Sequence, residues 1–102
     1  MPPDVAELMT AVNHPLRRRI LRIFVDEEIE VASASQLART TKEGVAKVDY
    51  HLKTLSRCAM LRPVPQLETA ERGGPSLGWA LDVDERWLRL MLDAWAQSDL
   101  AG

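Results

Sequence analysis

Two short helix patterns, separated by a brief break, constrain the fold of this chain most strongly. The first pattern runs from about Ser35 to Thr41, and the break falls on Lys42-Glu43-Gly44. The second pattern continues to about Cys58 and carries a single apolar stripe at helical steps of three and four residues. That stripe consists of Val45, Val48, Leu52 and Leu55. Roughly 14 residues at 1.5 Å each give a second helix about 20 Å long, with polar and basic residues opposite the stripe.

Two helices this close in sequence favour a helix-turn-helix, whose second helix lies in the major groove of DNA. We therefore expect the outer side of the second helix to contact a double-stranded site. Lys47 and Tyr50 are expected to reach base edges, and Lys53 and Thr54 to reach phosphates. The full set of expected contact residues is Arg39, Lys42, Ala46, Lys47, Asp49, Tyr50, Lys53, Thr54 and Arg72. The alternative is that these side chains form only the solvated face of the helix.

The charge of the chain is concentrated where this interpretation needs it. The net charge is −2 over 102 residues, which by itself argues mildly against nucleic acid. Residues 31–63, however, hold six basic and two acidic side chains, whereas residues 1–30 and 64–102 are both net negative. The positive charge therefore lies in the segment that would touch phosphates. Six cations over this length could also be an ordinary solvated surface.

The remaining segments predict a mainly α domain with a small β-hairpin. Residues 4–13 have an amphipathic helix pattern, and a second helix is expected from Pro15 to about Asp26, with Asn13 as a possible cap. The alternation in Ile29-Glu30-Val31 predicts a short strand. We expect the Arg17-Arg18-Arg19 run to be a solvated helix face, with one arginine able to pair with an acidic residue at 26–28.

After Leu61 the hydrophobic period changes from that of a helix to that of strands. Pro63 and Pro65 are tolerable only in an edge strand, and the residues around Gly73-Gly74 predict the loop of a hairpin. A last helix is expected over about 84–99, capped by Asp82 or Asp84. We expect one domain over 1–102, made of an N-terminal helix (1–13), a three-helix core (15–60), a wing (61–82) and a C-terminal helix (84–100).

Four features of the sequence are similar to one bacterial family. The stretch from His14 to Leu21 contains a proline, arginines and an Ile-Leu pair, and Leu37-Ala38 matches an "LA" pair in the first motif helix. Val48 with His51–Leu55 matches a "V..HL..L" recognition helix, and the spacing between the two motifs also agrees. The chain thus resembles, over nearly its whole length, the ArsR type of winged helix-turn-helix regulator. The resemblance implies a winged fold and transcriptional regulation through DNA.

The sequence departs from the pattern of that family at four places. Ala59-Met60 stands where the family usually has Gly-Leu, whose glycine adopts the left-handed geometry that ends the recognition helix. Lys42 stands in the turn where glycine is frequent, and Gly44 is a weaker cap than the usual serine. Asp49 replaces a small polar residue on the DNA side. Its carboxylate repels phosphate but can accept a hydrogen bond from a cytosine amino group.

The terminal helices predict a homodimer. The last helix is apolar over most of its circumference, because Leu90 and Leu92 widen its stripe beyond what one small domain requires. A two-fold dimer would place two recognition helices about 34 Å apart and imply a palindromic site. The alternative is that both tryptophans of this helix complete the core of a monomer. The expected interface residues are Leu8, Met9, Val12, Trp87, Leu88, Met91 and Trp95.

The sequence offers little support for metal, cofactor or catalytic chemistry. One cysteine and two histidines on separate segments do not form the clustered thiolates or paired ligands of a metal sensor. We expect Cys58 to be buried and His51 to pack at the boundary of the second motif helix. No nucleophile set and no phosphate-binding glycine loop is present, so an enzyme is not expected.

The resulting expectation is a cytoplasmic, dimeric, sequence-specific DNA-binding regulator, acting as a repressor without a metal-sensing site. No membrane contact is expected, and control would come from an unknown effector, a protein partner or the protein's own abundance. The competing hypothesis is a winged-helix module for protein–protein contact that does not bind DNA, which the acidic total and Asp49 favour.

Overall fold

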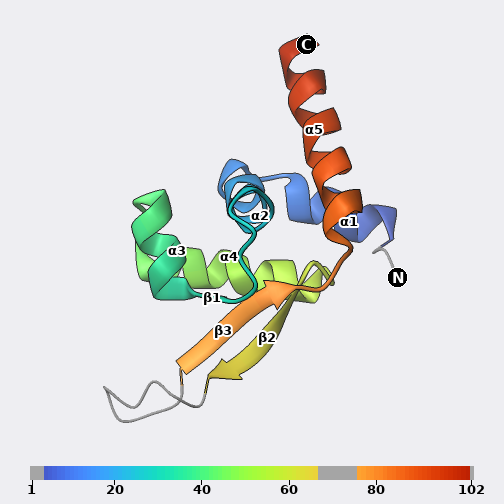
Figure 1. Ribbon diagram of the computed structural model, residues 1–102. Coiled ribbons are helices and arrows are strands. Elements are labelled where there is room, and N and C mark those ends of the chain that lie inside the picture. Colours follow the sequence, from blue (N-terminus) through green and yellow to red (C-terminus); the bar gives the residue numbers. More distant parts are fainter. Residues whose placement is uncertain (1–3, 67–75, 102) are drawn as a thin grey trace.

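The computed structural model of the protein describes residues 4–66 and 76–101 (Figure 1). The elements are α1 (Val5–Val12), α2 (Pro15–Asp26), β1 (Ala32–Ser33), α3 (Ala34–Thr41), α4 (Val45–Arg57), β2 (Leu61–Gln66), β3 (Ser76–Leu81) and α5 (Glu85–Ala101). Helices α3 and α4 form the expected helix-turn-helix, and β2 with β3 forms the wing. Helices α1 and α5 are added at the two ends of this winged helix-turn-helix, which confirms the predicted fold class.

The described strands form a single antiparallel sheet in the order β1-β3-β2. Strand β2 lies at the edge, where its Pro63 and Pro65 pair in register with Trp79 and Leu77 of β3. An edge strand tolerates proline, which has no backbone N–H, because the outer side of that strand has no neighbouring strand to receive a hydrogen bond. The predicted edge hairpin is therefore confirmed. Arg72 and Gly73-Gly74, at the expected tip of the wing, lie outside the described residues.

The first strand was predicted at the wrong place. Strand β1 is formed by Ala32 and Ser33, which pair with Trp79 and Gly78, rather than by residues 29–31. The reason lies in the end of α2. Glu28 has a positive φ of 51°, and the N–H of Ile29 donates to the carbonyl of Phe24, so the chain is still closing the helix there.

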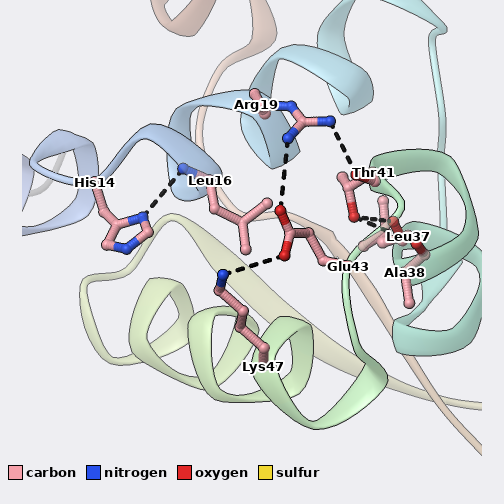
Figure 2. A network of polar contacts seen from close by, with 8 residues as sticks. All are labelled: His14, Leu16, Arg19, Leu37, Ala38, Thr41, Glu43 and Lys47. Atoms are coloured by element: carbon pink, nitrogen blue, oxygen red, sulfur yellow. Dashed lines mark hydrogen bonds and ion pairs between the residues drawn. The ribbon is translucent and has the colours of Figure 1, made fainter.

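Helix starts follow the sequence closely, with one exception. Ser33 caps α3 in a capping box with Gln36, and Gly44 caps α4 without a side-chain hydrogen bond. The Asp84 side chain accepts from the N–H of Arg86 at the start of α5. Helix α2, in contrast, is capped by His14 and not by Asn13, because His14 Nδ1 accepts from the N–H of Leu16 at 3.1 Å (Figure 2).

The arginine run of α2 does not form a simple solvated face. Arg17 donates to the carbonyls of Thr10 and Ala11, and Arg18 donates to the carbonyl of Val12. These carbonyls belong to the last turn of α1, which has no basic residue of its own. The run therefore caps the end of α1 from the neighbouring helix. Asp26 pairs instead with two arginines outside the run, Arg89 at 3.5 Å and Arg22 at 3.9 Å.

The core corrects part of the predicted dimer interface. Val12 and Leu88 are buried within the protomer, at 1 % and 0 % exposure, and Leu88 lies with Leu92 in the main hydrophobic core. These residues are thus used to attach α1 and α5 to the domain. Leu8, Trp87 and Met91 are partly buried against the same core. Beyond this attachment α5 extends away from the sheet, with its C-terminal end far from the wing (Figure 1).

Candidate nucleic-acid interface

The outer face of α4 is a line of exposed side chains on the second motif helix. Its apolar stripe is buried at Val48, Leu52 and Leu55, which are inaccessible to solvent. Val45 was expected in the same stripe, but it lies in the first turn of the helix and is 50 % exposed. The exposed residues opposite this stripe recur at i, i+4, i+7 and i+11, the spacing of one helix face. They are Ala46, Tyr50, Lys53 and Arg57, which we call the α4 outer face. Tyr50 is 60 % exposed, and its ring meets the ring of His51 edge-on, with 5.2 Å between the centroids.

Arg57 was not included in the predicted contact set, although it lies in line with Ala46 and Tyr50. Its guanidinium is exposed, and Nη2 donates to Thr54 Oγ1 at 3.1 Å. The step of four residues from Lys53 to Arg57 was available in the sequence and would have indicated it.

Thr54 was expected on the outer side of α4, and this expectation is wrong. The side chain is buried at 8 % exposure, and its hydroxyl donates to the carbonyl of Tyr50 at 3.1 Å while accepting from Arg57. A threonine hydroxyl frequently bonds the carbonyl four residues before it in a helix. Thr54 therefore positions the arginine that lies above it.

Asp49 lies at the margin of the α4 outer face and pairs with Lys53. Its Oδ2 is 2.9 Å from Lys53 Nζ, one helical turn away, and both side chains are more than a third exposed. Exposed pairs of this kind contribute only about 0.3–0.5 kcal/mol. The pair partly neutralises the carboxylate, and it is weak enough for a phosphate to compete for the lysine.

Lys47 lies on the flank of α4 that faces α2, away from the centre of the outer face. Its Nζ is 3.1 Å from Glu43 Oε1, and Glu43 Oε2 is 4.0 Å from Arg19 Nη1 (Figure 2). Arg19 also donates to the carbonyl of Thr41, the last residue of α3. This network joins α2 to the turn between α3 and α4.

The last turn of α3 and the turn that follows it expose two further cations. Lys42 follows α3 with a φ of 60°, and the N–H of Glu43 donates to the carbonyl of Ala38, so the lysine occupies a left-handed position that favours glycine. Lys42 and Arg39 are both exposed. The first N–H groups of α4 receive no side-chain cap from Gly44, and such groups bind phosphate readily.

His51 is buried at the boundary between α4 and α2, as predicted. Its Nδ1 is 3.0 Å from Arg17 Nη1, and its ring lies 4.3 Å from the ring of His14. Burial first, and then the charges of His14, Arg17 and Lys47, lower the pKa of His51 below its ordinary value of 6.5. Since arginine can only donate, the neutral imidazole accepts at Nδ1 and carries its proton on Nε2.

The single cysteine is likewise buried, at 6 % exposure, and burial raises the pKa of the Cys58 thiol. A thiol in this state is a poor nucleophile and a poor metal ligand. Within the described ranges no three histidine, cysteine or acidic side chains gather as a group that could hold a metal ion. Within those ranges, too, no helix has the length and apolar character needed to cross a membrane.

Comparison with known proteins agrees with this geometry. Residues 13–64, from the residue before the cap of α2 into β2, match a family described as helix-turn-helix domain, and the chain belongs to that family. No curated protein sequence matches it.

Two solved structures share the fold over most of the chain. A possible transcriptional regulator from Methanosarcina mazei Go1 is 18% identical, with a TM-score of 0.63 over 94% of this chain and 78% of that one. A transcriptional regulator homologue from Pyrococcus horikoshii OT3 is 17% identical, with a TM-score of 0.64 over 92% of this chain and 97% of that one. At this level of identity the two structures bear on the fold alone.

Proposed function

We propose that this protein is a sequence-specific, double-stranded DNA-binding transcriptional regulator of the ArsR-like kind, acting as a homodimeric repressor. The observation that carries the proposal is the α4 outer face, on which Tyr50, Lys53 and Arg57 stand exposed on the second helix of a helix-turn-helix. The family match and the descriptions of both similar structures as regulators support it.

In the proposed complex α4 lies in the major groove, which an α-helix of this length fits. Ala46 and Tyr50, in the first half of the helix, face the base edges, with apolar contact from the alanine methyl. Lys53 and Arg57 bind phosphates, and Lys47 binds a phosphate at the flank. Arg39, Lys42 and Arg72 add backbone contacts on either side of the motif. Asp49 tunes the affinity through its pair with Lys53.

The proposed dimer uses the apolar surface that the protomer leaves open on α1 and α5. Val5 and Met9 lie one turn apart on α1 and are 75 % and 50 % exposed, and Leu90 of α5 is 71 % exposed. Leu8, Trp87 and Met91 are only partly buried and can complete such an interface, whereas Trp95, expected there from the sequence, lies against Arg18 of α2. Exposed apolar side chains in this number favour association. Val12 and Leu88 no longer belong to the proposed interface, because the protomer core buries them.

The test is a binding selection from a random duplex library, followed by fluorescence anisotropy on the enriched duplex. A dimeric regulator enriches a palindrome whose half-sites lie about one DNA turn apart. Enrichment of a single half-site would contradict the dimer and keep the DNA-binding function. Absence of enrichment, with no binding even at low salt, would contradict the regulator and leave a protein-docking winged helix as the better account.

A further inference from the structure

A groove between α2 and α5 is separate from the α4 outer face. It encloses about 490 Å³, within the range of small-molecule sites, which is about 300–1,000 Å³. Thr40 of α3 is among its lining residues, so the groove reaches the first helix of the motif. The described residues that define its chemistry are Arg18, Arg19, Arg22, Ile23, Leu92 and Trp95.

The groove combines positive charge with an apolar floor. Arg18, Arg19 and Arg22 line it together, and no acidic residue is among its described lining residues. Each arginine uses part of its guanidinium on the protein: Arg18 on the carbonyl of Val12, Arg19 on the carbonyl of Thr41, and Arg22 on the exposed carboxylate of Asp93. A guanidinium has five N–H donors in a planar fork, so donors remain for an incoming carboxylate.

The tryptophan adds an aromatic wall. The Arg18 guanidinium lies over the Trp95 ring, 5.2 Å from its centroid, and Ile23 and Leu92 supply further apolar surface. The Trp95 indole Nε1–H is buried and meets no hydrogen-bond acceptor in the described part of the chain. Buried donors are nearly always paired, so this unpaired donor beside the groove is a further point at which a ligand acceptor can bind.

From this combination we propose that the α2–α5 groove binds a small amphipathic anion, with an aromatic or similarly flat apolar body and one carboxylate. The carboxylate binds the free donors of Arg18 and Arg22, and the apolar body packs on Trp95, Ile23 and Leu92. One wall of the groove is positively charged and the other is apolar. The groove therefore favours an amphipathic anion over a cation or a sugar.

The groove also has a direct connection to the helix-turn-helix. Arg19 lines the groove. Its guanidinium also donates to the Thr41 carbonyl and lies 4.0 Å from the Glu43 carboxylate (Figure 2). A carboxylate held by Arg18 and Arg22 lies beside Arg19 in the same groove and draws its guanidinium away from Glu43, which alters the turn between α3 and α4. This second step rests on the proposed function, since it makes the anion an effector of DNA binding.

Binding is tested first without DNA, by calorimetry on the full chain with 2-naphthoate and its neutral counterpart 2-naphthamide as probes. We expect 2-naphthoate to bind at least about tenfold more tightly, the factor that corresponds to roughly 1.4 kcal/mol for a charge-assisted hydrogen bond. Arg22→Gln should remove that preference, whereas Arg86→Gln, the same charge change at an exposed site outside the groove, should keep it. Equal affinity for the two probes, no binding up to about 1 mM, or equal effects of the two variants would overturn the proposal.

A blocking variant locates the binding. Ala96→Phe places a ring in the groove from an exposed position on α5, so both probes should lose affinity while the melting temperature stays unchanged. Retention of full affinity by Ala96→Phe would place the probe elsewhere and contradict the proposal.

The coupling is tested by anisotropy on the enriched duplex with and without saturating 2-naphthoate. We expect a shift in duplex affinity of at least about fivefold, the lower end of typical coupling, and an unchanged affinity would contradict the link through Arg19. Because the calorimetry contains no DNA, the two proposals fail separately. Binding of the probe without binding of the duplex would contradict the proposed regulator function alone. Binding of the duplex without binding of the probe would contradict the proposed ligand groove alone.

Discussion

At the scale of single residues, Ala59 occupies a backbone conformation that usually belongs to glycine. Its φ is 63°, and the N–H of Met60 donates to the carbonyl of Leu55 while that of Ala59 donates to Ser56. These two bonds are those of a Schellman ending, which the family pattern reaches with glycine. Alanine in place of glycine at position 59 therefore leaves the geometry of the helix end intact. It raises the free energy of that conformation by about 1–2 kcal/mol, the cost of a side chain in the left-handed region.

We expect Ala59→Gly to stabilise the protein by about 1 kcal/mol. The substitution removes the strain of the left-handed conformation, and the greater conformational entropy of glycine in the unfolded chain offsets part of that gain. The measurement is the free energy of unfolding in urea. Ala94→Gly, at an exposed position inside α5, is the matched control and should destabilise by about 0.5–1 kcal/mol. Loss of stability in both variants would contradict a left-handed Ala59.

His51 predicts a dependence of stability on pH. Because burial and neighbouring charges lower its pKa in the folded protein, the unfolded chain binds more protons on acidification. The contribution of the neutral histidine is therefore complete above the ordinary value of 6.5 and is lost as the pH falls below it toward the folded pKa. We expect the free energy of unfolding to fall between about pH 7 and pH 5.5, and to fall less in His51→Gln. An identical pH slope in the variant would contradict this role.

Residue-scale features were predictable where they depend on neighbours in sequence. Gly44 and Asp84 cap their helices as expected, because a cap acts within three residues of itself. Thr54 and His14 were misjudged for a related reason. Both side chains bond to nearby backbone groups. The sequence pattern favoured a surface role for Thr54 and indicated Asn13, not His14, as the cap of α2.

At the scale of elements, α1 depends on α2 for its end. Arg17 donates to two carbonyls of the last turn of α1 and also contacts His51 Nδ1 on α4, so one side chain joins three helices. No sequence pattern indicated this, because it depends on how closely two helices pack and not on the spacing within either one. The run of arginines looked like a solvated face for that reason.

We expect Arg17→Gln to destabilise the protein by about 2–3 kcal/mol, since it leaves part-buried carbonyls without a charged donor. Arg86→Gln is the matched control, an exposed arginine for which a change within about 0.5 kcal/mol is expected. Urea unfolding of both variants gives the comparison. Equal stabilities would mean that solvent caps α1 as well as Arg17 does.

The α4 helix was predictable as an element, and its outer face was predictable in part. The stripe of Val48, Leu52 and Leu55 fixed which side is buried, and Tyr50 and Lys53 were placed correctly as exposed. The carboxylate beside them was the main feature against DNA binding. Asp49 pairs with Lys53, an expected phosphate contact, so the effect of the carboxylate on DNA affinity can be measured by substituting Asp49.

On the proposed function, Asp49→Asn should tighten binding to the enriched duplex by roughly 3- to 10-fold, because one unit charge near a phosphate costs about 1 kcal/mol in water. Asp82→Asn, the same change at an exposed site away from α4, should alter affinity by much less. Anisotropy at about 0.1 M salt, where the Debye length is about 10 Å, compares the two. Weaker binding by Asp49→Asn would instead indicate that the carboxylate reads a cytosine amino group.

At the scale of the whole molecule, the order of elements was predictable almost throughout, and assembly was not. The periodicity of α5 indicated an excess of apolar side chains. It could not distinguish those that attach the helix to its own domain, such as Leu88 and Leu92, from those left open, such as Leu90. Only the packing of α5 on α2 separates the two groups.

The proposed dimer predicts that Leu90→Glu shifts the protein from dimer to monomer, because a charge in an apolar interface loses its hydration without a partner. Leu77→Glu, at an exposed leucine of β3, should leave the mass unchanged. Sedimentation equilibrium at tens of micromolar measures both. A wild-type monomer at that concentration, or a dimeric Leu90→Glu, would contradict the interface.

The central claim, that the α4 outer face lies against DNA, is tested most directly by the salt dependence of binding to the enriched duplex. Each phosphate contact contributes about 0.9 to the slope of log affinity against log salt. The double variant Lys53→Gln/Arg57→Gln should therefore lower that slope by about 1.8 for each protomer bound, with Arg86→Gln unchanged as the control. A slope in the double variant equal to that of the wild type would show that this face does not touch the phosphates, and would contradict the account.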